Sequence, residues 1–133
     1  DIVLDIAPDT PLLLADRAHM AQLVNNLVGN AMKYGRADTP IHVRCGASRS
    51  GQMLTLTVED QGDGIAPEHL PRLTERFYRV DSGRSRALGG TGLGLSLVKH
   101  IVERHRGHLS IASTVGVGTK FTILLPAAPP APE

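Results

Sequence analysis

The sequence is poor in the features that mark several classes of protein. Only 3% of its 133 residues are aromatic, tryptophan is absent, and Cys45 is the single cysteine. One cysteine excludes a disulfide framework and the paired spacing of a zinc site, so Cys45, in a strand-like segment, is expected to be a core thiol. No apolar run approaches the roughly eighteen residues that a membrane-spanning helix needs, and no signal peptide is visible. We therefore expect a soluble polypeptide without direct membrane contact.

An excess of charge is also lacking. The chain has 14 basic and 13 acidic residues, a net charge of +1, which excludes a broad nucleic-acid-binding surface. The basic residues are unevenly spread, because one short window holds the arginines Arg72, Arg76, Arg79, Arg84 and Arg86. The length suits one domain, predicted over residues 1–126, followed by a disordered Pro- and Ala-rich tail over 127–133. Because the chain starts directly in a strand-like segment, we expect it to be a piece of a longer protein.

The stretch from Asp16 to Gly35 is predicted to be one long helix. Its apolar residues recur at intervals of three and four, with Asp16 as the N-cap and Gly35 just past the end. Four polar residues fall on one stripe of this helix, namely Gln22, Asn26, Asn30 and Lys33. Asparagine is a poor choice for a solvated helix face, and Gly29 costs about 1 kcal/mol relative to alanine. The stripe is either an ordinary wet surface or a wall on which amides and an ammonium converge on a ligand.

The remaining elements alternate between strands and helices. Strands are predicted over 1–6, 12–14, 41–45, 53–58, 109–112 and 120–125, one helical turn over 67–70, and a second long helix that starts at Gly94 and is closed by Gly107. Between Leu73 and Gly90 the periodicity is lost, which indicates a long loop. The economical arrangement is an α/β two-layer sandwich: a mixed, mostly antiparallel sheet with its helices on one face.

Two further segments favour ligand binding. Asp60 ends an apolar strand and is followed by Gly62 and Gly64, so a carboxylate acceptor could take a hydrogen bond from an amine while a flat ring lies against the glycine backbone. An Asx turn that closes a hairpin is the simpler interpretation. The glycine-rich run that ends at Gly94 opens a helix, whose N-terminal amides suit a phosphate. It is neither a Walker A loop nor a dinucleotide-binding fingerprint, and simple turn geometry also explains it.

Taken together, these segments resemble the four boxes of sensor histidine kinases, in the family's order. Asn26 to Tyr34 resembles the N box, Asp60 to Gly64 the G1 box, Glu75 to Asp81 the F box, and Gly90 to Leu95 the G2 box. The resemblance covers nearly the whole chain and is strongest to phosphate-regulon sensor kinases. It implies the Bergerat ATP-binding fold, shared with topoisomerase, mismatch-repair and chaperone ATPases.

The resemblance also implies a role for individual residues. Asn30 would ligate Mg²⁺, and Asn26 and Lys33 would lie near the phosphates of ATP. Asp60 would accept a hydrogen bond from the adenine amine. The other implied contacts to the nucleotide come from Tyr34, Gly62, Gly64, Arg79, Gly90, Thr91, Gly92, Leu93 and Gly94. Of these groups, Asn30, Lys33 and Arg79 are the implied catalytic residues, with Arg79 reaching the triphosphate from the loop.

By the same resemblance, the chain would bind Mg·ATP and transfer the γ-phosphoryl group to a histidine on a separate dimerisation domain. None of its own six histidines lies in the family's phosphoacceptor context. The implied partners are that domain and a response regulator, and the domain itself would be a monomer on the cytoplasmic side of a bacterial membrane-anchored sensor. Three alternatives remain open: an ATPase module that hydrolyses ATP to drive closure, a nonenzymatic nucleotide-sensing domain, and a serine kinase acting on anti-sigma partners. The first is disfavoured because the Asn-bearing helix has no glutamate base before Lys33.

Overall fold

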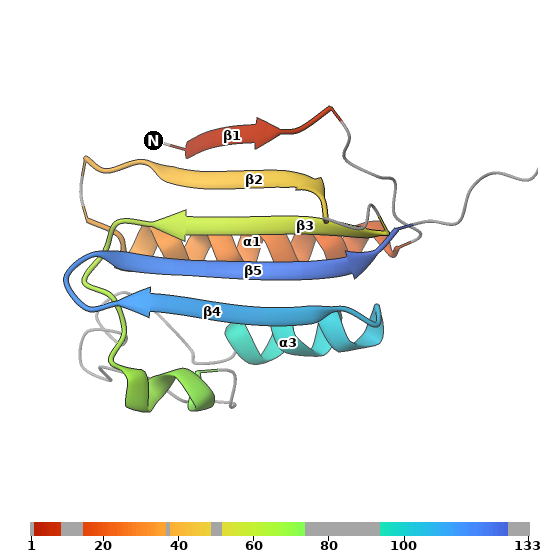
Figure 1. Ribbon diagram of the computed structural model, residues 1–133. Helices are drawn as coiled ribbons and strands as arrows, with labels where there is room; N and C mark the ends of the chain where they lie inside the picture. Colours follow the sequence, from red (N-terminus) through yellow and green to blue (C-terminus); the bar gives the residue numbers. More distant parts are fainter. Residues whose placement is uncertain (1, 9–14, 37, 49–51, 74–93, 128–133) are drawn as a thin grey trace, which may run out of the picture.

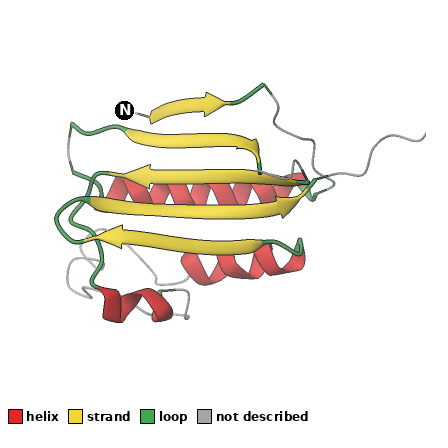
Figure 2. Cartoon of the chain, in the orientation of Figure 1, coloured by secondary structure: helices red, strands yellow, loops and turns green. Residues whose placement is uncertain are grey.

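The computed structural model describes residues 2–8, 15–36, 38–48, 52–73 and 94–127. Five strands form one sheet in the order β1-β2-β3-β5-β4, and they are β1 (Ile2–Ile6), β2 (Ile41–Ala47), β3 (Met53–Asp60), β4 (His108–Thr114) and β5 (Gly118–Pro126). β1 pairs with β2 in parallel, and the other neighbours are antiparallel. Helices α1 (Arg17–Tyr34) and α3 (Gly94–Arg104) lie together against one face of this sheet (Figures 1 and 2). The predicted two-layer α/β sandwich is confirmed.

α1 follows the predicted boundaries. Asp16 is the N-cap, its side chain accepting the backbone N–H of His19 at 3.0 Å. The helix ends at the C-cap Gly35, whose N–H donates to the carbonyl oxygen of Ala31 at 2.8 Å. Leu23 and Leu27 are completely buried. None of the helices in the described part of the chain is long and apolar enough to cross a bilayer.

The core lies between the helices and the sheet. Alternate residues of β3 and β5 are buried on the helix side, and these are Leu54, Leu56, Val58, Phe121, Ile123 and Leu125. Full burial of one such side chain stabilises the fold by about 1.5–3 kcal/mol. Half-buried Cys45 packs against this core, as predicted for its thiol, and burial raises its pKa. The core therefore fixes β3 and β5 as the centre of the sheet beneath α1 and α3.

Most strands extend beyond their predicted bounds because cross-strand pairing continues where the apolar pattern stops. β3 reaches Asp60, which pairs with Thr119, and β5 reaches Pro126, which pairs with Met53. Ala127, assigned to the tail, donates its N–H to the carbonyl oxygen of Gln52 at 3.0 Å. The predicted helical turn is the 3₁₀ helix η1 (Pro67–Arg72). The expected strand 12–14, the loop from residue 74 onward and the tail from residue 128 lie outside the described residues.

The end of α3 differs from the prediction in one respect. Gly107 closes the helix by donating to the carbonyl oxygen of Val102 at 2.9 Å, while Arg106 donates to that of Glu103 at 3.0 Å. These two bonds form a Schellman motif in which the left-handed residue is Arg106, at φ 59°, and not the glycine. Glycine is required at 107 because a Cβ atom there would collide with the carbonyl oxygen of Leu124.

Gly107→Ala is therefore expected to lower the free energy of unfolding by about 1–3 kcal/mol, since the collision is with backbone that cannot rotate away. Gly29→Ala is the matched control, because nothing lies within 4 Å of a Cβ at that helical position. It is expected to raise stability by about 1 kcal/mol. Urea unfolding measures both, and wild-type stability for Gly107→Ala would contradict the packing described here.

Candidate functional site

The polar stripe of α1 is only partly solvated. Gln22 and Lys33 are exposed, whereas Asn26 and Asn30 are half-buried. A Cβ atom at Gly94 would lie 3.6 Å from Oδ1 of Asn26, so this amide faces the first residue of α3. The structure thus brings one predicted N-box residue to the end of the glycine-rich run. The interpretation of the stripe as a wet surface fits its outer members but not its two central asparagines.

Asp60 forms a second wall. It lies on the helix-facing side of β3 and is only 6% exposed. The backbone N–H groups of Gly62 and Thr119 donate to its carboxylate. Burial raises the pKa of Asp60 above its usual range, the charge of Glu59 acts in the same direction, and the two backbone hydrogen bonds oppose the shift. Asp60 is therefore a buried acceptor whose orientation is fixed by the backbone around it.

The turn after Asp60 is joined to the end of α1. Gly35 and Gly62 form an antiparallel bridge, and Arg36 donates its backbone N–H to the carbonyl oxygen of Gln61 at 3.1 Å. A Cβ atom at Gly35 would lie 3.6 Å from that of Asp60 and 2.7 Å from the carbonyl oxygen of Ala31. The C-terminal end of the asparagine stripe and the buried carboxylate are consequently held side by side.

The same turn is joined to the β4–β5 hairpin. Arg36 donates from Nη2 to the carbonyl oxygen of Gly116 at 2.8 Å, and the N–H of Gly116 donates to that of Asp63 at 2.7 Å. Gly64 has φ +76°, and a Cβ there would collide with the backbone of Thr114. Packing within the domain already explains glycine at 64, and its contact with a ring stays a prediction.

Sequence reasoning missed two residues of this region, Ser113 and Thr119. Thr119 is 6% exposed, and its hydroxyl oxygen lies 2.9 Å from Oγ of Ser113. Ser113 also accepts the N–H of Ile65 at 2.7 Å and bonds to the carbonyl oxygen of Gly118 at 3.1 Å. Both residues occupy inward positions that are otherwise apolar along β4 and β5. A polar residue in phase with an apolar strand face was the available signal.

Several predicted site residues lie wholly or partly outside the described structure. Tyr34 ends α1, but its side chain is not described, and Arg79, Gly90, Thr91, Gly92 and Leu93 lie outside the described residues. Among the parts of the chain that are described, no group of three or more His, Cys, Asp and Glu side chains is arranged to hold a metal ion. Asn26, Asn30, Lys33, Asp60, Gly62, Gly64 and Gly94 are the predicted residues whose positions are known.

One histidine links the two helices. The ring of His105, after the end of α3, accepts the N–H of Asp16 on Nε2 at 3.3 Å, and its Nδ1 lies 2.8 Å from the carbonyl oxygen of Ile101. Both contacts are satisfied by a neutral ring with its hydrogen on Nδ1. His105 thereby ties the N-cap of α1 to the last turn of α3.

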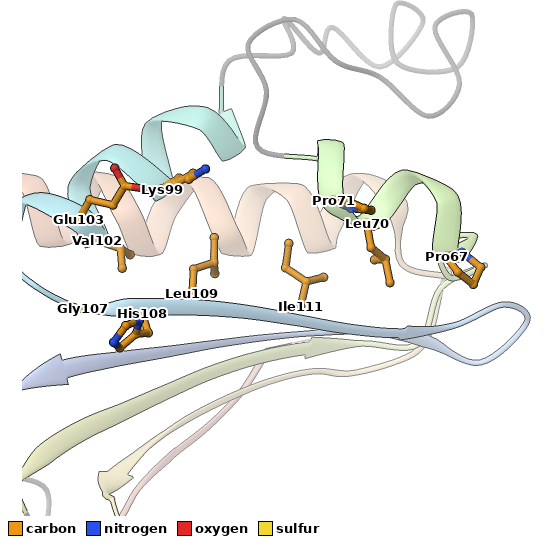
Figure 3. Close-up of a pocket in the computed structure, with 10 residues that line it drawn as sticks. All are labelled: Pro67, Leu70, Pro71, Lys99, Val102, Glu103, Gly107, His108, Leu109 and Ile111. Atoms are coloured by element: carbon orange, nitrogen blue, oxygen red, sulfur yellow. The ribbon is translucent and has the colours of Figure 1, made fainter.

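A cavity of about 750 Å³ lies between η1, α3 and β4, away from Asp60 and the polar stripe of α1 (Figure 3). Leu70, Leu109 and Ile111 point into it, while Lys99 and Glu103 of α3 lie at its rim. None of the site residues predicted from the sequence lines it. The cavity is therefore not the region formed by Asp60 and the stripe of α1.

Comparisons with known proteins identify relatives of this chain by sequence and by fold. The family model described as "Histidine kinase-, DNA gyrase B-, and HSP90-like ATPase" matches residues 15–129. The phosphate regulon sensor protein PhoR of Pseudomonas aeruginosa is 49% identical over 121 residues, 91% of this chain and 27% of PhoR. The structure of the mycobacterial sensor histidine kinase MprB is 30% identical, with a TM-score of 0.83 over 97% of this chain and 84% of that one. Full-length ShkA in complex with AMPPNP is 29% identical, with a TM-score of 0.77 over 98% of this chain and 27% of that one.

Proposed function

The chain belongs to the family of histidine kinase-, DNA gyrase B- and HSP90-like ATPases, and from this premise we propose that it binds Mg·ATP and donates the γ-phosphoryl group to a histidine on a separate domain. Its similarity to PhoR agrees with the expected resemblance to phosphate-regulon sensors. Because the chain spans about a quarter of the length of the curated relatives it matches, the activity and partners of the whole protein belong to this proposal.

The observation that carries the proposal is the placement of α1 between the turn after Asp60 and the start of α3. Gly35, at its C-terminal end, is bridged to the turn after Asp60, and Asn26 faces the first residue of α3. A ligand along this stripe would meet a buried acceptor at one end and a helix N-terminus at the other. An adenine amine suits the carboxylate, and phosphates suit the helix amides.

Asn30 lies between these ends and is the proposed ligand for Mg²⁺. Asn30 is half-buried, and its carboxamide offers an oxygen donor of the kind that Mg²⁺ prefers. The described residues offer no acidic cluster that would enclose the ion, so its other ligands would come from phosphates and water, as is usual for this ion. When bound, Mg²⁺ supplies charge neutralisation on the triphosphate. Asn26 and Lys33 would then hold the phosphates in line.

The reaction class follows from what α1 lacks. No glutamate precedes Lys33 in the helix, and Gln22 cannot accept a proton, so α1 offers no base that would activate water. Phosphoryl transfer depends mainly on positioning and on charge stabilisation, for which amides and an ammonium suffice. We therefore assign transfer to a histidine in preference to hydrolysis. A dimerisation domain and a response regulator are the proposed partners, with this domain on the cytoplasmic side of a membrane-anchored sensor.

The first test uses γ-labelled ATP with Mg²⁺. The fragment is expected to bind ATP or ADP without labelling itself, and to label a separately added histidine-bearing dimerisation domain from a related sensor kinase. Labelling is measured by electrophoresis and binding by calorimetry. Self-labelling without that domain would contradict the proposal, and steady ATP hydrolysis with nucleotide-driven dimerisation would favour an ATPase module.

A further inference from the structure

Three polar side chains form one row across the helix-facing side of the sheet. Asp60 of β3 pairs with Thr119 of β5, which pairs with Ser113 of β4. The next row into the sheet consists of apolar residues, namely Val58, Phe121 and Ile111. Asp60 and Thr119 are the buried polar residues of the described chain. On this face of the three strands, the polar side chains therefore form a single row, which starts at Asp60, the carboxylate proposed to recognise the base.

Ser113 uses its full hydrogen-bonding capacity in this row. A serine hydroxyl has one hydrogen and two acceptor positions. The N–H of Ile65 takes one acceptor position at 2.7 Å, and the carbonyl oxygen of Gly118, at 3.1 Å, can only accept. If Ser113 donates to Gly118, its remaining acceptor position faces the Thr119 hydroxyl at 2.9 Å. In this assignment each hydroxyl hydrogen has an acceptor, so Thr119 donates to Ser113.

Because the Thr119 hydroxyl donates its hydrogen to Ser113, it cannot donate that hydrogen to a ligand. With its hydrogen turned toward Ser113, the Thr119 hydroxyl keeps only acceptor character on its other sides. Its backbone N–H meanwhile bonds to Asp60. A purine edge at this position would therefore meet two acceptors, the Asp60 carboxylate and the Thr119 hydroxyl. An amino group satisfies both, whereas a carbonyl oxygen would face lone pairs with no hydrogen to share.

We propose that Ser113 is a positioning residue for base selection, which holds the Thr119 hydroxyl as an acceptor so that the site takes a 6-amino purine and rejects a 6-oxo purine. The proposal rests on the proposed ATP-binding function. Ser113 acts through Thr119 and touches no nucleotide itself. Without the Ser113 hydroxyl, Thr119 is free to rotate and to donate its hydrogen to a carbonyl oxygen.

The test compares ATP with ITP, which differ at this edge of the purine. Calorimetry gives both dissociation constants for wild-type protein and for Ser113→Ala. We expect the ratio of the ITP to the ATP dissociation constant to fall about tenfold in Ser113→Ala, since one discriminating hydrogen bond changes direction. Ser110→Ala is the matched control, because Ser110 lies on the exposed face of the same strand. It should keep the wild-type ratio.

Two further variants separate positioning from a general structural effect. Ser113→Thr retains a hydroxyl and should keep the wild-type ratio. Thr119→Val deletes the hydroxyl but keeps the N–H that bonds to Asp60, so it should lower the ratio as Ser113→Ala does. The two effects should not add in the double variant, because they act through one contact. Equal weakening of ATP and ITP in Ser113→Ala, or additive losses in the double variant, would overturn the proposal.

The same measurements separate this proposal from the function on which it rests. Wild-type protein that discriminates against ITP, together with an unchanged ratio in Ser113→Ala, would overturn the role of Ser113 alone. Wild-type protein that binds ATP and ITP equally would overturn both this role and the assignment of Asp60 to the adenine amine.

Discussion

Replacing Asp60 with asparagine is expected to weaken ATP binding at least about a hundredfold, because a hydrogen bond to a buried charged acceptor is lost and a buried donor is left unpaired. The asparagine amide keeps one acceptor oxygen, yet the N–H groups of Gly62 and Thr119 and the adenine amine all need acceptors. Its NH₂ group would therefore face another donor. Calorimetry with Mg·ATP measures the loss.

Asp63→Asn is the matched control for this experiment. Asp63 lies in the same turn, but its side chain is exposed and forms an ion pair with Arg36 at 3.9 Å. Exposed ion pairs contribute little, so the control should bind ATP as the wild type does. Normal ATP binding by Asp60→Asn would show that the adenine assignment is wrong.

Asn30→Ala is expected to reduce phosphoryl transfer to an added histidine domain by about two to three orders of magnitude, because an oxygen that positions the metal and phosphates is removed. ATP binding measured in the presence of a chelator should stay close to that of the wild type, since Asp60 still accepts from the base. The rate of labelling from γ-labelled ATP at saturating nucleotide and Mg²⁺ gives the first quantity.

Asn25→Ala provides the comparison for Asn30→Ala. Asn25 is exposed on the same helix but lies outside the polar stripe, so its loss alters helix propensity without altering the proposed site. A wild-type rate of transfer in Asn30→Ala, or an equal fall in both variants, would contradict the role given to Asn30.

The sequence was informative where the structure depends on local spacing. The bounds of α1, its cap at Asp16 and its end at Gly35 follow from periodicity and capping within about twenty residues. The apolar alternation also located β2 and β3, which pair in the antiparallel sense. For the same reason Asp60 could be identified as a polar residue that ends an apolar strand.

The parts that were missed depend on contacts between distant segments. β5 continues to Pro126 because Met53 pairs with it, and nothing near Leu125 in the sequence reveals this. Glycine at 107 is required by the backbone at Leu124, so the left-handed role passes to Arg106. Cross-strand pairing likewise joins Thr119 to Ser113. Local pattern carries no information on such packing.

The order of the strands has a consequence for how the domain forms during synthesis. β5 is the last described strand to leave the ribosome, yet it lies between β3 and β4 (Figure 1). Until β5 emerges, β4 has no neighbour in the sheet and Asp60 lacks the Thr119 N–H. Non-local pairing of this kind is slow and leaves strand edges exposed. A nascent chain that stops before β5 therefore carries α1 and Asp60 but lacks the Thr119 N–H that holds the carboxylate. Nucleotide affinity should arise only once β5 has emerged.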